Sequence, residues 1–167
     1  MQEVNINEAF EAYKPYGCAL VISIDENGKP SGMTNAWHMK CSREPALLAI
    51  SMMKTGYTHE LIRQSKEFVL AVANKELEKE VRFFGSTHGN VVDKFKETGI
   101  ETEPAKFIKS PLVKKATVNF ECVVEREVDA GDHIIFIGKI LNSYVNPGKK
   151  VLLSFGKVGD QRVFEEL

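Results

Sequence analysis

Residues 117 to 127 largely alternate between apolar and polar side chains, and this pattern constrains the fold more than any other feature of the chain. The apolar set is Val118, Phe120, Cys122 and Val124. The polar set is Asn119, Glu121, Glu125 and Glu127. A period of two places the two sets on opposite faces of a strand, and such alternation is typical of an antiparallel sheet with one buried and one solvated face.

Short apolar or β-branched runs predict further strands at residues 18–24, 32–41, 45–51, 67–73, 133–142 and 151–155. Helices are expected at 57–65, 75–84 and 91–98, and a loop with two prolines at 101–111. About six strands in hairpin order, with the helices grouped in the middle, favour an α+β, mainly antiparallel sheet or small barrel over βαβ winding. Since no internal repeat or linker divides the chain, residues 1–167 are predicted to form a single domain.

The charge balance argues against nucleic acid or a membrane surface as a partner. The chain has 22 Lys and Arg against 23 Asp and Glu, a formal net charge of -1. Both partners are bound through concentrated basic patches. No run approaches transmembrane length, and the first residues lack the basic and apolar regions of a secretion signal.

The cysteines point to a reducing compartment. Cys18, Cys41 and Cys122 are widely spaced and form no Cys-x-x-Cys motif. This spacing suits neither a disulfide framework nor a zinc site. We therefore expect reduced, buried thiols in a cytoplasmic protein.

Residues 51–58 have the composition of an anion-binding turn. An apolar strand ends at Ser51, Lys54 lies in the connection, and a helix is expected to begin near Tyr57. The free N–H groups of a first helical turn and the helix dipole attract an anion, and a lysine adds a full charge. The same pattern occurs where a turn only caps its own helix, so both interpretations stay open here.

Several other chemistries lack their sequence signatures. The segment Gly85-Ser86-Thr87-His88-Gly89 is not Gly-x-Ser-x-Gly, which argues against a serine hydrolase. The four histidines share no i, i+4 spacing and have no obvious carboxylate partner, which argues against a metal site. Neither Gly-x-Gly-x-x-Gly nor a Walker A motif occurs, so a dinucleotide Rossmann site and NTP hydrolysis are not expected.

Five segments match one family pattern in the right order. They are GMTNAW at 32–37, PALLAIS at 45–51, YTHELI at 57–62, FFGSTHGNVVDKF at 83–95 and DHIIFIG at 132–138. Together they resemble the flavin-reductase-like family of FMN-binding split β-barrels, in particular its flavoredoxin-type members. The resemblance covers roughly residues 16 to 145, and it implies a six-stranded antiparallel Greek-key split barrel with a few short helices, working as a homodimer.

The chain departs from that pattern at four positions. Phe84 stands where a Cys is usual, His88 where a Ser is usual, Asn90 where an Arg is usual, and Glu44 where the first Pro is usual. These positions concern the flavin edge and the nicotinamide side. The phosphate-binding half of the pattern is intact.

The resemblance implies three groups of FMN-binding residues. The strand edge beside the isoalloxazine ring comprises Thr34, Asn35, Ala36 and Trp37. The turn that follows the ribityl chain to the phosphate comprises Ser51, Met52, Met53 and Lys54, with the Thr58 hydroxyl behind it. A second loop comprises Gly85, Ser86, His88 and the further cation Lys94. Core packing for Trp37, Met52 and Met53, a strand cap for Ser51 and a solvated Lys94 are the competing interpretations.

The expected activity is that of an NAD(P)H-dependent flavin (FMN) oxidoreductase. NADH or NADPH delivers a hydride to the flavin, and electrons pass on to a flavin, a ferric chelate or a protein acceptor. His133 is the candidate catalytic residue near the nicotinamide, and a packed structural histidine is the competing interpretation. FMN is expected because only one phosphate cradle, at Lys54, is evident in the sequence.

Two other functions remain open at this point. One is a flavin-carrying electron-transfer protein without its own NAD(P)H oxidation. The other is an interaction domain that has lost its cofactor.

Overall fold

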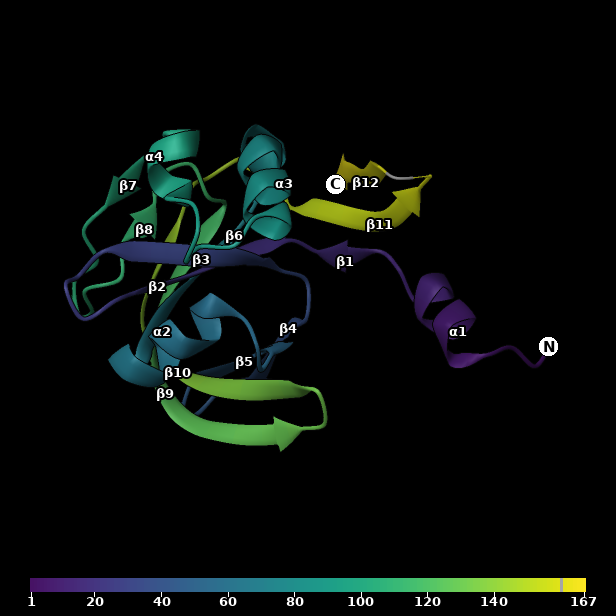
Figure 1. The fold of residues 1–167 in the computed structure, drawn as a ribbon, viewed down its shortest axis with the longest axis horizontal. Helices are drawn as coiled ribbons and strands as arrows, with labels where there is room; N and C mark the ends of the chain where they lie inside the picture. The colour runs from purple at the N-terminus through teal and green to yellow at the C-terminus, as the bar shows by residue number, and fades with distance from the viewer. Residues whose placement is uncertain (160) are drawn as a thin grey trace.

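A seven-stranded antiparallel sheet forms the body of the computed structural model, which describes residues 1–159 and 161–167 (Figure 1). In spatial order its strands are β3 (Pro30–Asn35), β2 (Ala19–Ile24), β6 (Glu67–Val72), β9 (Val118–Ala130), β10 (His133–Val145), β5 (Leu47–Met53) and β4 (His38–Ser42). Every neighbouring pair is antiparallel. The mainly antiparallel prediction is therefore confirmed.

Two smaller sheets and the helices complete the fold. A three-stranded sheet contains β1 (Tyr16–Gly17), β11 (Leu152–Val158) and β12 (Gln161–Glu166), and a two-stranded one contains β7 (Thr102–Glu103) and β8 (Leu112–Val113). The helices are α1 (Ile6–Ala12), α2 (Tyr57–Ser65), the short 3-10 helix η1 (Lys75–Leu77), α3 (Glu78–Ser86) and α4 (Lys94–Thr98). No helix in the described part of the chain is long and apolar enough to cross a membrane.

The predicted six-stranded barrel is wrong in its strand count. The largest sheet is not closed, and it has seven strands. The additional strand arises because the single strand expected at 32–41 is two strands, β3 and β4, at opposite edges of the sheet. The chain changes edge at Ala36 and Trp37. This break is fixed by the Ser51 N–H, which donates to the Trp37 carbonyl over 2.8 Å.

The core lies on both faces of the sheet, as alternation along β2 and β6 requires. On one face Leu20 and Ile22 pack with α3, whose buried stripe contains Val81 and Phe84. On the other face Val21 packs with residues of β5, β10 and α2. The two helices α2 and α3 therefore belong to different layers.

The polar face predicted for residues 117–127 is buried at its centre. Glu121 is 0% exposed, and Asn119 is buried as well. The segment 101–116, of which 101–111 was expected to be a surface loop, covers this face. It supplies backbone donors for both side chains: Lys106 and Phe107 N–H donate to Glu121, and Val113 N–H donates to Asn119. The polar side chains of this face can be buried because the backbone of the covering segment supplies their hydrogen-bond partners.

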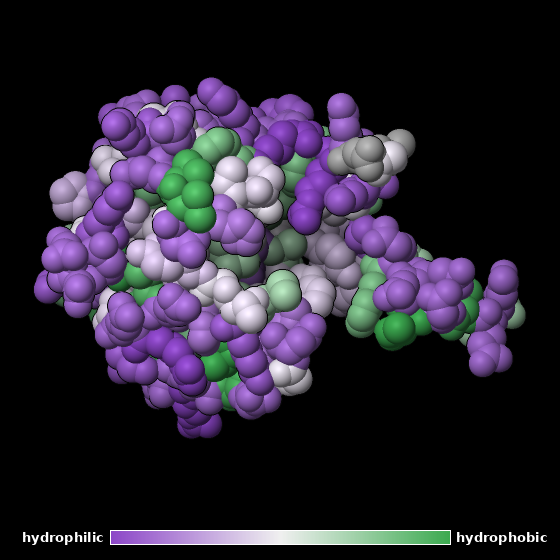
Figure 2. Space-filling model, viewed as in Figure 1, coloured by the Kyte–Doolittle hydropathy of each residue, from purple (hydrophilic) through white to green (hydrophobic). Residues whose placement is uncertain are grey.

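The N-terminal helix α1 projects from the body as an arm (Figure 1). A capping box of Asn5 and Glu8 fixes its start, yet none of its residues is buried. Phe10 and Tyr13 are exposed, and Figure 2 shows apolar side chains along this arm and a hollow between the arm and the body. Helices of this length derive their stability from packing, so an arm without buried residues requires a partner surface.

Candidate functional site

The break between β3 and β4 brings together four residues that the sequence predicted. Buried Asn35 donates from Nδ2 to the Ser51 carbonyl over 2.7 Å, and its Oδ1 lies 3.3 Å from His38 Nδ1. The Trp37 carbonyl accepts the Ser51 N–H. As a result Asn35, Ala36, Trp37 and Ser51 form one polar-lined edge, whose shape is set by backbone hydrogen bonds.

A stacked ring pair lies at one end of this edge. The Trp37 and His133 rings are 4.7 Å apart between centroids, with an interplanar angle of 27°. Trp37 is 49% exposed, so it does not fill the core. His133 has a carboxylate partner that the sequence analysis missed: its Nδ1 lies 2.7 Å from Asp132 Oδ1. The hydrogen bond from His133 lowers the pKa of the Asp132 carboxyl.

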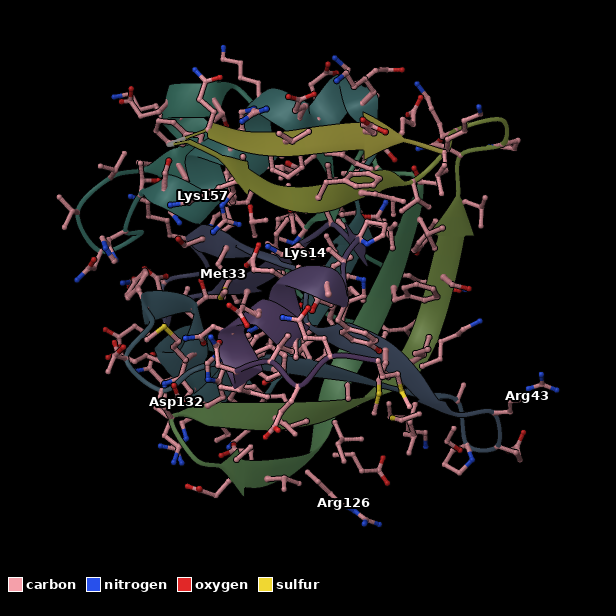
Figure 3. All side chains as sticks on the ribbon, turned by 90° about the vertical axis from the view of Figure 1, so that its right-hand side faces the viewer. Lys14, Met33, Arg43, Arg126, Asp132 and Lys157 are labelled. Atoms are coloured by element: carbon pink, nitrogen blue, oxygen red, sulfur yellow. The ribbon has the colours of Figure 1, made fainter. Side chains whose placement is uncertain are left out.

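An apolar cleft of about 420 Å³ opens beside the ring pair. Ala36, Trp37, Ser51 and Ile135 line its sheet side, and we call it the apolar cleft. The other side is lined by Phe10 and Tyr13 of the arm and by Tyr16 of β1. Figure 3 looks onto this side of the molecule, with α1 in front of the sheet. The volume falls within the roughly 300–1,000 Å³ typical of small-molecule and cofactor sites.

The turn after β5 separates its predicted residues. Met52 is buried in the core, whereas Met53 is exposed. Lys54 forms an ion pair with Asp129, with Nζ 2.5 Å from Oδ2, and hydrogen bonding from Lys54 lowers the pKa of Asp129. The following helix α2 begins after Gly56, and among the described residues no side chain caps its first N–H groups. The first N–H groups of α2 are thus free of a capping side chain, as an anion site requires.

The last turn of α3 contains Gly85 and Ser86 and lies against β3. A Cβ at Gly85 would lie 3.3 Å from the Thr34 side chain, a tight contact, so the absent side chain favours this close approach. Thr34 Oγ1 donates to the Val81 carbonyl over 2.6 Å, and Ser86 Oγ donates to the Arg82 carbonyl over 2.9 Å. Both hydroxyl oxygens keep acceptor capacity.

Lys94 does not occupy the predicted phosphate position. It is 3% exposed, and its Nζ donates to the Gly32 and Phe84 carbonyls, both over 2.9 Å. Burial lowers the pKa of its ammonium group to about 8. Because both of these carbonyls bind its ammonium group, Lys94 links β3 to the end of α3. Lys94 is therefore neither a phosphate ligand in this structure nor a solvated surface lysine.

A second cleft, of about 610 Å³, has basic walls. Its lining includes Thr34, Gly85, Ser86, Arg82, Lys157 and Arg162, and we call it the basic cleft. The sequence analysis missed all three cations. Arg82 lies in the predicted helix at 75–84 but was not identified as a site residue, whereas Lys157 and Arg162 lie on the β11–β12 hairpin, of which only part of β11 was predicted. The basic cleft thus contains Thr34 at one end of the predicted flavin edge, and the apolar cleft contains Ala36 two residues further on.

Residues 12–160 match the model of the flavin reductase like domain. The chain belongs to this family. It is 38% identical to an uncharacterised protein of Archaeoglobus fulgidus over 83% of this chain and 76% of that one. A ferric-chelate reductase (NAD(P)H) of the same organism is 29% identical, over 87% of this chain and 84% of that one.

Solved structures share the fold of this flavin reductase like domain. The NADH:FAD oxidoreductase SgcE6 of Streptomyces globisporus superimposes with a TM-score of 0.85 at 24% identity, covering 100% of this chain and 98% of that one. The flavoredoxin of Desulfovibrio vulgaris (Miyazaki F) superimposes with a TM-score of 0.84 at 20% identity, covering 99% and 93%. The predicted family is therefore confirmed.

The residues of the domain fit a flavin in three respects. The apolar cleft offers apolar and aromatic walls, and the edge at residues 35–37 offers backbone polar groups. Cations are available from Lys54 and from the basic cleft. His88 lies on the exposed part of the α3 loop, outside the lining of both clefts. Thr58 is buried in the first turn of α2.

Proposed function

We propose that this domain oxidises NADH or NADPH with FMN and passes the electrons to a second flavin, a ferric chelate or a protein. The observation that carries the proposal is the apolar cleft, where Trp37 borders the cavity and stacks on His133. A flat apolar wall beside a polar backbone edge suits a fused ring with a polar rim. The names of the ferric-chelate reductase and NADH:FAD oxidoreductase relatives support the same reaction class.

The residues of the chain have binding and orienting roles in this proposal. When bound, the flavin supplies the redox chemistry, as it takes a hydride from the nicotinamide and releases electrons to the acceptor. The backbone at Asn35 to Trp37 holds the polar rim, and Lys54 with the start of α2 holds a phosphate. Trp37 and His133 form the surface against which the nicotinamide is oriented. Orientation matters because a correctly placed donor removes a large part of the entropic barrier.

Anaerobic stopped-flow mixing tests the reaction directly. The FMN-loaded protein is mixed with NADH or NADPH, and the loss of flavin absorbance is followed. Direct bleaching by one of the two donors is expected. Retained flavin with no bleaching by either donor would instead support the flavin-carrying electron-transfer protein. A protein that binds no flavin at all would support the interaction domain.

The same proposal includes the quaternary and cellular setting. Residues 1–167 form one flavin-reductase domain in a split-barrel arrangement, and two copies associate as a homodimer. Exposed Trp37, Met39 and Met53 near the site, together with the unburied arm, give an apolar surface for the second copy. Cys18 and Cys122 are buried as expected, whereas Cys41 is exposed, contrary to the expectation of three buried thiols. Free thiols suit a reducing cytoplasm.

A further inference from the structure

The basic cleft has an electrostatic feature that packing does not explain. Lys157 and Arg162 are direct cross-strand partners in the β11–β12 hairpin, and both are exposed. Like charges directly opposite each other destabilise an antiparallel pair. A bound anion would remove this repulsion, so the register of the hairpin favours a negatively charged ligand.

Arg82 completes the cationic wall and is fixed in place. Its guanidinium donates to Glu78 through Nε and Nη2 and to the Arg162 carbonyl through Nη1 over 2.8 Å. It also lies 4.6 Å from the centroid of the Phe164 ring. Arg82 therefore positions the β12 strand and Arg162, while Glu78 neutralises its charge. The described lining residues contain three cations and no carboxylate, and Asp160 lies outside the described residues.

The position of the cleft narrows the class of anion. Thr34, Gly85 and Ser86 line it, and these are three of the predicted flavin-binding residues. Arg and Lys with nearby hydroxyl groups are typical of phosphate recognition. Thr34 of the basic cleft and Ala36 of the apolar cleft are two residues apart, so a nucleotide whose ring lies in the apolar cleft has this cationic site further along the same edge.

We propose that the basic cleft binds a phosphate group of a nucleotide whose ring occupies the apolar cleft, with Arg162 and Lys157 as its ligands. The inference rests on the proposed function, since it takes the nucleotide from that reaction. It adds a second phosphate site to the one expected at Lys54. The phosphate belongs either to the flavin or to the nicotinamide dinucleotide, and the two sources can be distinguished.

Equilibrium dialysis with matched probes provides the test. FMN is compared with riboflavin, and NADH with 1-benzyl-1,4-dihydronicotinamide, because the second probe of each pair lacks phosphate. The variants are Arg162→Gln and Lys157→Gln. The controls are Arg126→Gln and Lys139→Gln, which change the net charge equally on other strands, β9 and β10. Figure 3 shows Arg126 and Lys157 at opposite ends of the molecule.

The dissociation constant of one phosphate-bearing probe is expected to rise about 10-fold or more in both variants, with its phosphate-free counterpart unchanged. A rise for FMN assigns the flavin phosphate, and a rise for NADH assigns the dinucleotide. Unchanged constants for both, equal losses for the phosphate-free probes, or equal losses in the controls would overturn the proposal. Melting temperatures confirm that each variant is folded.

These readouts are independent of turnover. A protein that shows the phosphate-specific loss but no flavin bleaching by NADH or NADPH would refute the proposed function and keep the phosphate site. Normal flavin bleaching with unchanged binding constants would support the proposed function and refute the phosphate site.

Discussion

His133 has two neighbours of different chemistry, the Trp37 ring and the Asp132 carboxylate. The carboxylate orients the imidazole through Nδ1, which leaves Nε2 for another partner. If His133 positions the nicotinamide, His133→Ala is expected to slow flavin reduction by NADH roughly 100-fold, with little change in FMN affinity or melting temperature. Single-turnover bleaching and thermal melting of one sample measure both. A lower melting temperature with an unaltered rate would assign His133 a packing role.

Lys54 forms an ion pair at the surface with Asp129, and such pairs contribute little to stability. It can therefore exchange Asp129 for a phosphate at the start of α2. Lys54→Ala is expected to weaken FMN binding by roughly 10- to 150-fold, the loss of one charge-assisted hydrogen bond of about 1.5–3 kcal/mol, and to leave the fold intact. Equilibrium dialysis measures the change, with Lys29→Ala, which removes another exposed ion-paired lysine, as the control. Equal FMN affinities of the wild type and Lys54→Ala would show that the FMN phosphate does not bind at Lys54, and would leave the basic cleft as its site.

The residues of the site differ in how far the sequence could predict them. Asn35 and Ser51, which belong to local motifs, lie together because the Asn35 side-chain amide donates to the Ser51 carbonyl and the Ser51 N–H donates to the Trp37 carbonyl. Arg162 could not be predicted, since its place depends on a hairpin that packs against α3 through Arg82. Lys94 was misjudged because a lysine is rarely buried, and no sequence signal announces the two carbonyls that hold it.

At the scale of elements, the segment 101–116 is fastened to the sheet by Glu121. Its carboxylate accepts hydrogen bonds from Lys106 N–H at 2.9 Å, Phe107 N–H at 2.8 Å and the Tyr144 hydroxyl at 2.6 Å. Burial by itself would raise the pKa of Glu121, but the hydrogen bonds from Tyr144, Lys106, Phe107 and Asn142 outweigh it and hold the pKa below its usual value. The ionised form is therefore the one that the folded state prefers.

This preference gives stability a defined dependence on pH. The folded pKa is lower than the unfolded one, so the contribution of Glu121 is present in full above the unfolded pKa and is lost as the pH falls through the folded pKa. Glu121→Gln is expected to lower the free energy of unfolding at neutral pH by about 1.5–3 kcal/mol and to flatten the acid limb of the stability curve. Urea unfolding at several pH values measures both effects. An unchanged acid limb would show that other carboxylates control acid unfolding.

The sequence predicts the local elements of the fold better than the contacts between distant elements, as it does for the site. Periodicity predicted β2, β6 and α2 well, because each depends on its own pattern of apolar residues. It could not reveal that a break at Ala36 and Trp37 sends the chain from one sheet edge to the other, or that another segment covers the polar face of β9. Both features are tertiary contacts between residues far apart in the chain.

At the scale of the whole molecule, the arm and the site share an apolar surface. Phe10 and Tyr13 on the arm, and Trp37 and Met39 on the body, are exposed and line the apolar cleft. In Figure 1 the arm extends away from the sheet, so it is free to lie against another copy. A second copy that covers both the arm and this cleft would exclude water from the bound ring.

The expected assembly is a homodimer in which the arm contributes to the site. Light scattering at micromolar concentration is expected to give twice the chain mass of 18.7 kDa. The double variant Phe10→Ser with Tyr13→Ser removes apolar area from the arm, and it is expected to weaken both association and FMN binding, because the two depend on one surface. Phe107→Ser, an exposed aromatic outside both clefts, is the control. A monomer that keeps its flavin, or a variant that dissociates with unchanged FMN affinity, would separate the arm from the site and leave the cleft to be completed within one chain.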